Sequence, residues 1–203
     1  SMLVAAVSGA DTKRARTVLP LAAEFAKEGL AEALMAAVDG EDQGLGFAAL
    51  EALAKIDPAK AVQRAGPWLV HEDSARRDMA REILEGAGQH QAALPHYEAV
   101  FDSSAFKTAD IAEKRTMYVS VGRAAGRTGL ALVREAATRG GMMAGRESHE
   151  LRAAAILALG LLADTTSRGL IEKASKGWRV PAVVSAACQN ALQAIRKSKG
   201  SPR

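Results

Sequence analysis

The residues of this chain best suited to metal binding or nucleophilic chemistry are four histidines and one cysteine: His71, His90, His96, His149 and Cys188. A zinc site on a helix usually takes two histidines four positions apart, which places both rings on one face. None of the four histidines has such a neighbour, and no serine, threonine or cysteine lies in a recognisable nucleophile motif. The sequence therefore predicts no metal site, no cofactor and no catalytic residues.

Three other short features bear on chemistry and location. The glycine-rich segment Gly140–Gly145 has the pattern of neither a phosphate-binding loop nor a dinucleotide fingerprint, so we expect a spacer. The single cysteine cannot form an intramolecular disulfide, which favours a reducing compartment and a role in core packing. The apolar piece Met2–Val7 is too short to span a membrane and lacks a basic leader. We therefore expect a cytoplasmic protein with no membrane span.

Charge is distributed unevenly along the chain. Residues 1–102 hold 10 Lys or Arg against 16 Asp or Glu, whereas residues 103–203 hold 17 against 7. A basic half of this kind can attract nucleic acid, an anionic membrane surface or an acidic protein, and composition does not separate the three. Part of the excess can equally be solvated helix surface that confers solubility alone.

Within the basic half, several cations share helical faces. Arg127 and Arg134 are seven positions apart and Lys173 and Lys176 three apart, so each pair lies on one face of a helix. Two tryptophans, Trp68 and Trp178, lie near turns and can either anchor an interface or cover the end of a core. The full set of candidate partner-binding cations is Arg123, Arg127, Arg134, Arg139, Arg168, Lys173, Lys176 and Arg179.

The elements that must carry these side chains are helices. Alanine accounts for 44 of the 203 residues and aromatic residues for only 4%, which favours closely packed helices over sheets. The clearest segment is Glu150–Gly160, where apolar residues recur at helical spacing among small ones and a glycine ends the run. Its outline recurs, because apolar anchors at the ends of successive first helices are separated by 31, 37, 38 and 33 residues. These anchors are Leu53, Leu84, Val121, Leu159 and Leu192.

In these motifs the sequence resembles the HEAT-repeat family, and bacterial HEAT-like domains in particular. Leu151-Arg152, Ala154-Ala155 and Leu159-Gly160 match the outline of a HEAT first helix, and residues 183–192 match it without the arginine. The resemblance covers about residues 44–197. It implies that Arg152 is structural and reaches an acidic residue of a neighbouring turn, and that the returning helices line a concave side.

The fold class that follows is all-α, an α-solenoid of about five antiparallel helical hairpins plus a final helix. We expect one HEAT-like domain over residues 3–197, with residues 3–43 as a degenerate amino-terminal cap. Ser1-Met2 looks like a cloning scar, and residues 198–203 are expected to form a disordered tail. Because each hairpin buries too little apolar surface alone, neighbouring hairpins must stack.

Three functional hypotheses remain open at this level. The first is a noncatalytic scaffold or adaptor that binds a protein partner with an acidic surface through its basic concave side. The second is nucleic-acid binding, as in the HEAT-like DNA alkylpurine glycosylases, although this chain has only 8 aromatic residues and no convincing counterpart of the catalytic acid. The third is a regulatory module excised from a larger bacterial signalling or motility protein.

Overall fold

A computed structural model of the chain describes residues 19, 29–139, 145–176 and 179–200. These residues form helices and turns and contain no strand, so the all-α prediction is confirmed for the described part of the chain. The elements in chain order are α3 (Leu30–Val38), α4 (Gln43–Ile56), α5 (Pro58–Ala65), η1 (Gly66–Val70), α6 (Ser74–Gly86), α7 (His90–Asp102), α8 (Ser104–Thr108), α9 (Ile111–Ala124), α10 (Gly126–Thr138), α11 (Arg146–Leu161), η2 (Thr165–Ser167), α12 (Arg168–Ser175) and α13 (Ala182–Gly200).

The chain divides into two units, and the division falls within α7. The first unit is Ser1–His96 and the second is Tyr97–Arg203. A single domain over residues 3–197 therefore stays a prediction, and each unit is described by itself. The predicted cloning scar, most of the predicted amino-terminal cap and residues 140–144 of the glycine-rich segment lie outside the described residues.

In the first unit, short turns with aspartate caps separate the helices. Asp57 accepts a hydrogen bond from the backbone N–H of Lys60, and Pro58 opens α5, as the Asp-Pro pair predicts. Gly66-Pro67 ends α5 and starts the 3-10 helix η1, because proline removes a backbone donor. The N-cap of α6 is Asp73, whose carboxylate accepts from the N–H of Ala75, and Ser74 is the first helical residue.

The largely polar segment Asp102–Thr108 contains the short helix α8. Ser103 caps this helix by accepting a hydrogen bond from the N–H of Phe106 at 3.1 Å. The Phe106 ring is buried and packs against Phe101 and Tyr118, with ring centroids 4.9 and 5.7 Å away. This aromatic contact holds the segment in a helical turn, which its polar composition does not indicate.

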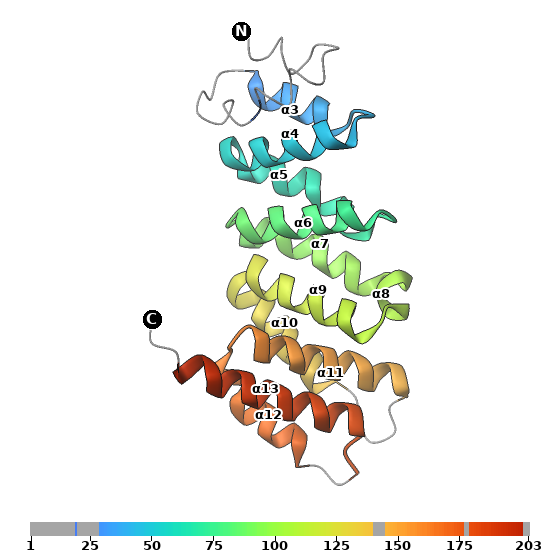
Figure 1. Cartoon of the computed structure of the whole chain (residues 1–203), viewed down its shortest axis with the longest axis vertical. Helices are drawn as coiled ribbons and strands as arrows, with labels where there is room; N and C mark the ends of the chain where they lie inside the picture. Colours follow the sequence, from blue (N-terminus) through green and yellow to red (C-terminus); the bar gives the residue numbers. More distant parts are fainter. Residues whose placement is uncertain (1–18, 20–28, 140–144, 177–178, 201–203) are drawn as a thin grey trace. The chain divides into compact units, whose positions relative to one another are not determined.

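In the second unit the helices form two layers (Figure 1). The helices α9, α11 and α13 contact one another in sequence on one side, and α10 and α12 lie behind them and contact each other. The central element is α11, whose residues Ala153–Ile156 and Ala158–Gly160 are buried. Leu159 is fully buried, in agreement with its predicted anchor position.

Gly160 lies inside α11 and does not end the helix, because α11 continues to Leu161. A Cβ atom added at Gly160 would lie 2.6 Å from the Cα of Ala191 on α13. Since that neighbour is backbone, α11 and α13 can approach this closely only with glycine at residue 160. The small residues of the Glu150–Gly160 segment therefore serve helix packing.

The carboxyl-terminal end differs from the prediction. Helix α13 continues to Gly200, so Ser198, Lys199 and Gly200 are helical where a disordered tail was expected. The hydroxyl of Ser198 donates to the carbonyl of Ile195 at 2.9 Å, which satisfies a polar group near the helix end. Residues 201–203 lie outside the described residues.

Candidate functional site

The predicted basic side chains all belong to the second unit, and most of them are exposed. Arg127 lies in the first turn of α10, Lys173 lies near the end of α12, and Lys176 is the residue that follows this helix. All three are exposed, and none makes an ion pair or a hydrogen bond with another described residue. Arg123 and Arg179 are also exposed. Trp178, the second predicted interface anchor, lies outside the described residues.

Two of the predicted cations form exposed pairs within their own helical segments. Arg139 contacts Glu135 at 2.7 Å, and Arg168 contacts Glu172 at 2.8 Å. Both pairs have i, i+4 spacing and exposed or half-exposed side chains, so each contributes only a few tenths of a kcal/mol, roughly 0.3–0.5. These two arginines are therefore partly neutralised.

Arg134 differs, because it belongs to a partly buried polar cluster with Asp164, Thr166 and Ser167. Its Nε and Nη2 atoms donate to the two carboxylate oxygens of Asp164, each at 2.8 Å, in a bidentate arrangement. Nε also donates to the hydroxyl of Ser167, and Nη2 contacts the hydroxyl of Thr166. The Asp164 side chain is only 6% exposed. Arg134 therefore joins α10 to the turn after α11, and its Nε and Nη2 donors are already occupied.

The pKa of Asp164 reflects this cluster. Burial, the largest influence, acts to raise the pKa of the carboxyl group, but hydrogen bonds from Arg134, Ser167 and Thr166 and the charge of Arg134 outweigh it. The net result lowers the pKa of Asp164 to about 2. The carboxylate thus stays charged at all ordinary pH values and neutralises Arg134.

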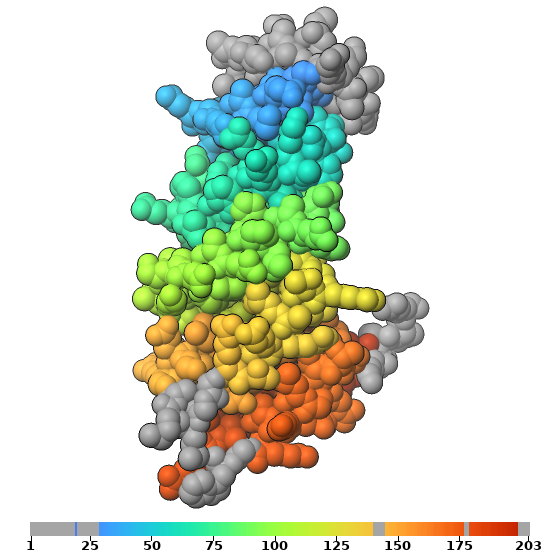
Figure 2. Space-filling view, turned by 180° about the vertical axis from the view of Figure 1, so that it is seen from behind, coloured from blue at the N-terminus to red at the C-terminus, as the bar shows by residue number. Residues whose placement is uncertain are grey.

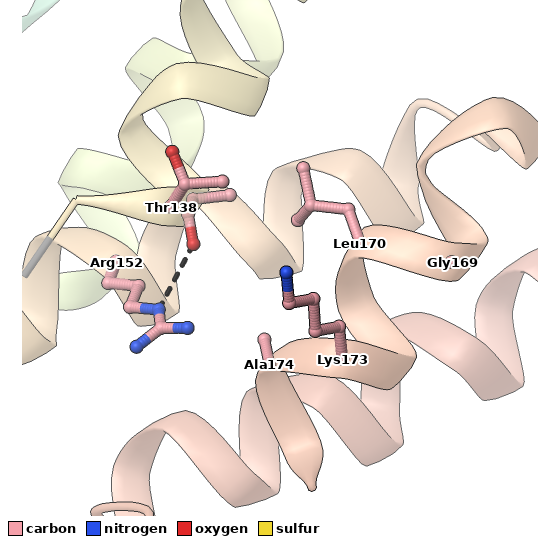
Figure 3. A pocket seen from close by; sticks show the side chains of 7 residues that line it. Thr138, Arg152, Gly169, Leu170, Lys173 and Ala174 are labelled. Atoms are coloured by element: carbon pink, nitrogen blue, oxygen red, sulfur yellow. Dashed lines mark hydrogen bonds between the residues drawn. The ribbon is translucent and has the colours of Figure 1, made fainter. Parts of the chain in front are cut away.

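A pocket of about 570 Å³ lies in the second unit, between the end of α10, the side of α11 and α12 (Figure 3). Two cations, a hydroxyl and three apolar side chains supply most of its wall. They are Arg152, Lys173, Thr138, Ala137, Leu170 and Ala174. The lining includes no carboxylate. We call this feature the Arg152–Lys173 pocket.

Arg152 is oriented in this pocket by one backbone contact. Its Nε donates to the carbonyl oxygen of Ala137 at 3.0 Å, near the carboxyl end of α10. The last carbonyls of a helix lack partners within the helix, so this donor satisfies one of them. The resemblance implies an acidic partner for Arg152, and here the expectation is wrong, because Nε donates to a backbone carbonyl. The terminal amino groups of its guanidinium have no partner among the described residues.

The structure thus places Lys173 in one pocket with Arg152, for which the resemblance implies a structural role. Figure 3 draws the Lys173 ammonium between the Arg152 side chain and Leu170. The two helices that carry most of the pocket, α10 and α12, are seen from their outer side in Figure 2, in yellow and orange. No sequence motif links Arg152 to Lys173, because their place in one pocket depends on how α12 packs against α13 and α10.

In the first unit, Trp68 packs on side chains of its own unit. Its ring centroid lies 5.8 Å from that of Phe47, and the Arg76 guanidinium lies 5.2 Å from the ring. Arg76 also approaches the Nε2 atom of His71, whose Nδ1 accepts from the backbone N–H of Asp73. These contacts give Trp68 a packing role, and it belongs to a different unit from the pocket.

Two of the remaining candidate groups, His96 and Cys188, are partly or fully buried. Burial lowers the pKa of His96, against whose ring Gly66 packs so closely that an added Cβ would lie 2.2 Å from Nδ1. Burial likewise raises the pKa of Cys188. In the part of the chain that the structure describes, no three histidine, cysteine or acidic side chains are grouped as a metal site would require. None of the helices in that part combines the length and apolar character needed to cross a membrane.

Comparison with known proteins adds no relative. No protein-family model matches the chain, and none of the curated proteins matches it. The functional argument therefore depends on the geometry of the second unit.

Proposed function

We propose that this protein is a noncatalytic interaction scaffold that binds an acidic segment of a partner protein on the α10 and α12 side of its second unit. The observation that carries the proposal is the Arg152–Lys173 pocket, whose charged groups are both cations. A cavity that faces two cations and no acid attracts an anionic ligand. The polar groups of its wall are suited to holding such a ligand.

The wider surface supports an acidic partner. The pocket lies in the half of the chain that holds 17 Lys or Arg against 7 Asp or Glu, and the exposed Arg127 and Lys176 carry further positive charge. Positive potential over a surface raises the association rate of an acidic partner and aligns it before contact. The apolar side chains of the pocket then give the complex a desolvated centre.

The layered packing supports a HEAT-like solenoid as the architecture of this scaffold. Within the second unit, first helices contact first helices and the returning helices α10 and α12 contact each other, which is the neighbour pattern of stacked hairpins. In such a stack the returning helices form one continuous face. An acidic segment that follows this face would pass over the pocket.

Binding can be measured by fluorescence anisotropy with two labelled peptides, one rich in glutamate and one with each glutamate replaced by glutamine. We expect the acidic peptide to bind the full chain and the glutamine peptide to bind at least tenfold more weakly. Lys173→Glu should weaken binding of the acidic peptide by at least tenfold, because it places a negative charge in the pocket. Arg134 is unsuitable for such a variant, since Asp164 already neutralises it.

The matched control is Lys197→Glu, which makes the same change in net charge at an exposed position of α13 outside the pocket. It should weaken binding no more than about twofold. Equal losses in the two variants would show that net charge alone attracts the peptide and would contradict the proposal. Tighter binding of a labelled DNA duplex than of the acidic peptide at physiological salt, with the steep salt dependence of phosphate contacts, would favour the nucleic-acid alternative.

A further inference from the structure

The wall of the Arg152–Lys173 pocket is divided by chemistry. Arg152 and Lys173 supply positive charge, whereas Ala137, Leu170 and Ala174 supply an apolar surface in the same cavity. A ligand that fills both parts must carry an anionic group and a short apolar chain close together. This requirement is narrower than acidity alone.

Arg152 is prepared to bind a planar anion. The bond from its Nε to the carbonyl of Ala137 holds one edge of the guanidinium, while the terminal amino groups lack a partner among the described residues. A guanidinium held in this way offers parallel donors that match the two oxygens of a carboxylate. Lys173 adds a second positive charge without fixing the geometry, because an ammonium acts as a point charge.

The Arg134–Asp164 cluster shows the same kind of contact, an arginine bound to a carboxylate, elsewhere in this unit. There an arginine of the same unit binds a carboxylate with two bonds of 2.8 Å, and a neighbouring hydroxyl of Ser167 completes the site. The Arg152–Lys173 pocket offers an arginine but no carboxylate in its lining, and the hydroxyl of Thr138 already donates to the carbonyl of Glu135. The missing group is therefore one that a ligand can supply.

Among protein ligands, the terminal residue of a chain carries both required groups. A glutamate or aspartate side chain brings a carboxylate, but the same residue has no separate aliphatic side chain to fill the apolar wall. A carboxyl-terminal leucine, isoleucine or valine brings the main-chain carboxylate and an apolar side chain from a single Cα atom. The volume of about 570 Å³ lies within the range of roughly 300–1,000 Å³ of ligand pockets, so the terminal residue and part of its neighbour fit.

We propose that the Arg152–Lys173 pocket binds the carboxyl terminus of a partner protein whose last residue is aliphatic. The terminal carboxylate binds Arg152 and Lys173, and the last side chain packs against Leu170 and Ala174. The proposal rests on the function proposed above and specifies which part of the acidic partner enters the pocket. The residues before the terminus supply the acidic character that the surrounding cations attract.

The test uses the full chain and three labelled peptides that share one acidic sequence. The first ends in leucine with a free carboxylate, the second ends in leucine amide, and the third ends in glutamate with a free carboxylate. We expect the first to bind at least tenfold more tightly than the amide, because the amide lacks the anionic group. It should also bind at least threefold more tightly than the glutamate peptide, which cannot fill the apolar wall.

Two variants, Arg152→Lys and Leu170→Gln, test whether these differences in affinity arise in the pocket, and Lys197→Glu is the control. Arg152→Lys keeps the charge but removes the planar donors, so we expect the ratio between free acid and amide to fall from tenfold or more to about twofold. Lys197→Glu should leave this ratio unchanged. A thermal melt followed by circular dichroism checks that Arg152→Lys is folded, and Leu170→Gln provides a second variant that should remove the preference for leucine over glutamate.

The outcomes separate this inference from the proposed function. If the free acid and the amide bind equally well and Lys173→Glu weakens both, the acidic surface binds its partner elsewhere along the peptide and the terminal-carboxylate inference is wrong. If none of the three peptides binds, both proposals are wrong. Displacement of the leucine peptide by inorganic phosphate as readily as by N-acetyl-leucine would also overturn the inference, since phosphate makes no use of the apolar wall.

Discussion

Two polar sites in the second unit, each built around an arginine, differ in whether the protein itself supplies the negative charge that pairs with the arginine. At the Arg134–Asp164 cluster, a nearly buried carboxylate, two hydroxyl groups and an arginine satisfy one another. At the Arg152–Lys173 pocket, two cations face a cavity with no carboxylate in its lining. The difference shows that the number of arginines on a surface does not identify a binding site. What identifies one is the absence of an internal partner.

Stability should change most when Asp164, the internal partner of Arg134, is removed. Asp164→Ala leaves Arg134 without its carboxylate at a partly buried position, and we expect a loss of about 3 kcal/mol in the free energy of unfolding. Urea unfolding followed by circular dichroism measures it. Arg168→Ala, which removes one partner of an exposed pair, is the control and should cost less than about 0.5 kcal/mol. Equal costs for the two variants would mean that the Arg134–Asp164 cluster is no more structural than a surface pair.

Lowering the pH gives a second measure of how much the Arg134–Asp164 cluster stabilises the fold, and the expected loss of stability is smaller. The pKa of Asp164 is lowered from 3.8 to about 2, so its stabilising contribution is complete above pH 4 and is lost as the pH falls through about 2. The shift corresponds to about 2 kcal/mol. Asp164→Asn lacks this titration. We therefore expect the wild-type chain to lose about 2 kcal/mol more than Asp164→Asn between pH 5 and pH 2, and parallel pH profiles of stability would contradict the assignment.

Sequence alone predicts the helices that carry these side chains better than it predicts which side chains come together. Helical periodicity, alanine content and turn signals such as Asp57-Pro58 predict the all-α fold, because they depend on neighbours within a few positions. Asp164 is recognisable as a turn and capping residue, and it does accept from the N–H of Thr166. Its partner Arg134 lies 30 positions earlier, so their pairing depends on how α10 packs beside the turn after α11.

The dependence on packing between distant segments also explains why the sequence does not predict the Arg152–Lys173 pocket. Arg152 lies in a run of small residues that packs as predicted, and the resemblance assigns it a structural role. The structure agrees in part, since Nε does bind a backbone carbonyl of α10. Arg152 and Lys173 line one pocket only because the short helix α12 packs beside α10 and α13. A sequence signal for such a pocket would be a cation in a small-residue helix with no acid on the following turn.

Giving the Arg152–Lys173 pocket a carboxylate of its own should change stability least. It also tests directly whether the absence of that carboxylate is what makes the pocket a binding site. Leu170 is half-buried, lies in the first turn of α12 and lines the pocket three positions before Lys173. Leu170→Glu should place a carboxylate beside both cations, at a helix start where negative charge is favourable. Relative to Leu170→Gln, we expect a gain of about 0.5 kcal/mol in stability and at least a tenfold weaker affinity for the acidic peptide ending in leucine. Because both variants lose the same apolar contact, the difference between them reports the carboxylate alone. Equal affinities in the two variants would mean that the pocket cations do not bind the ligand.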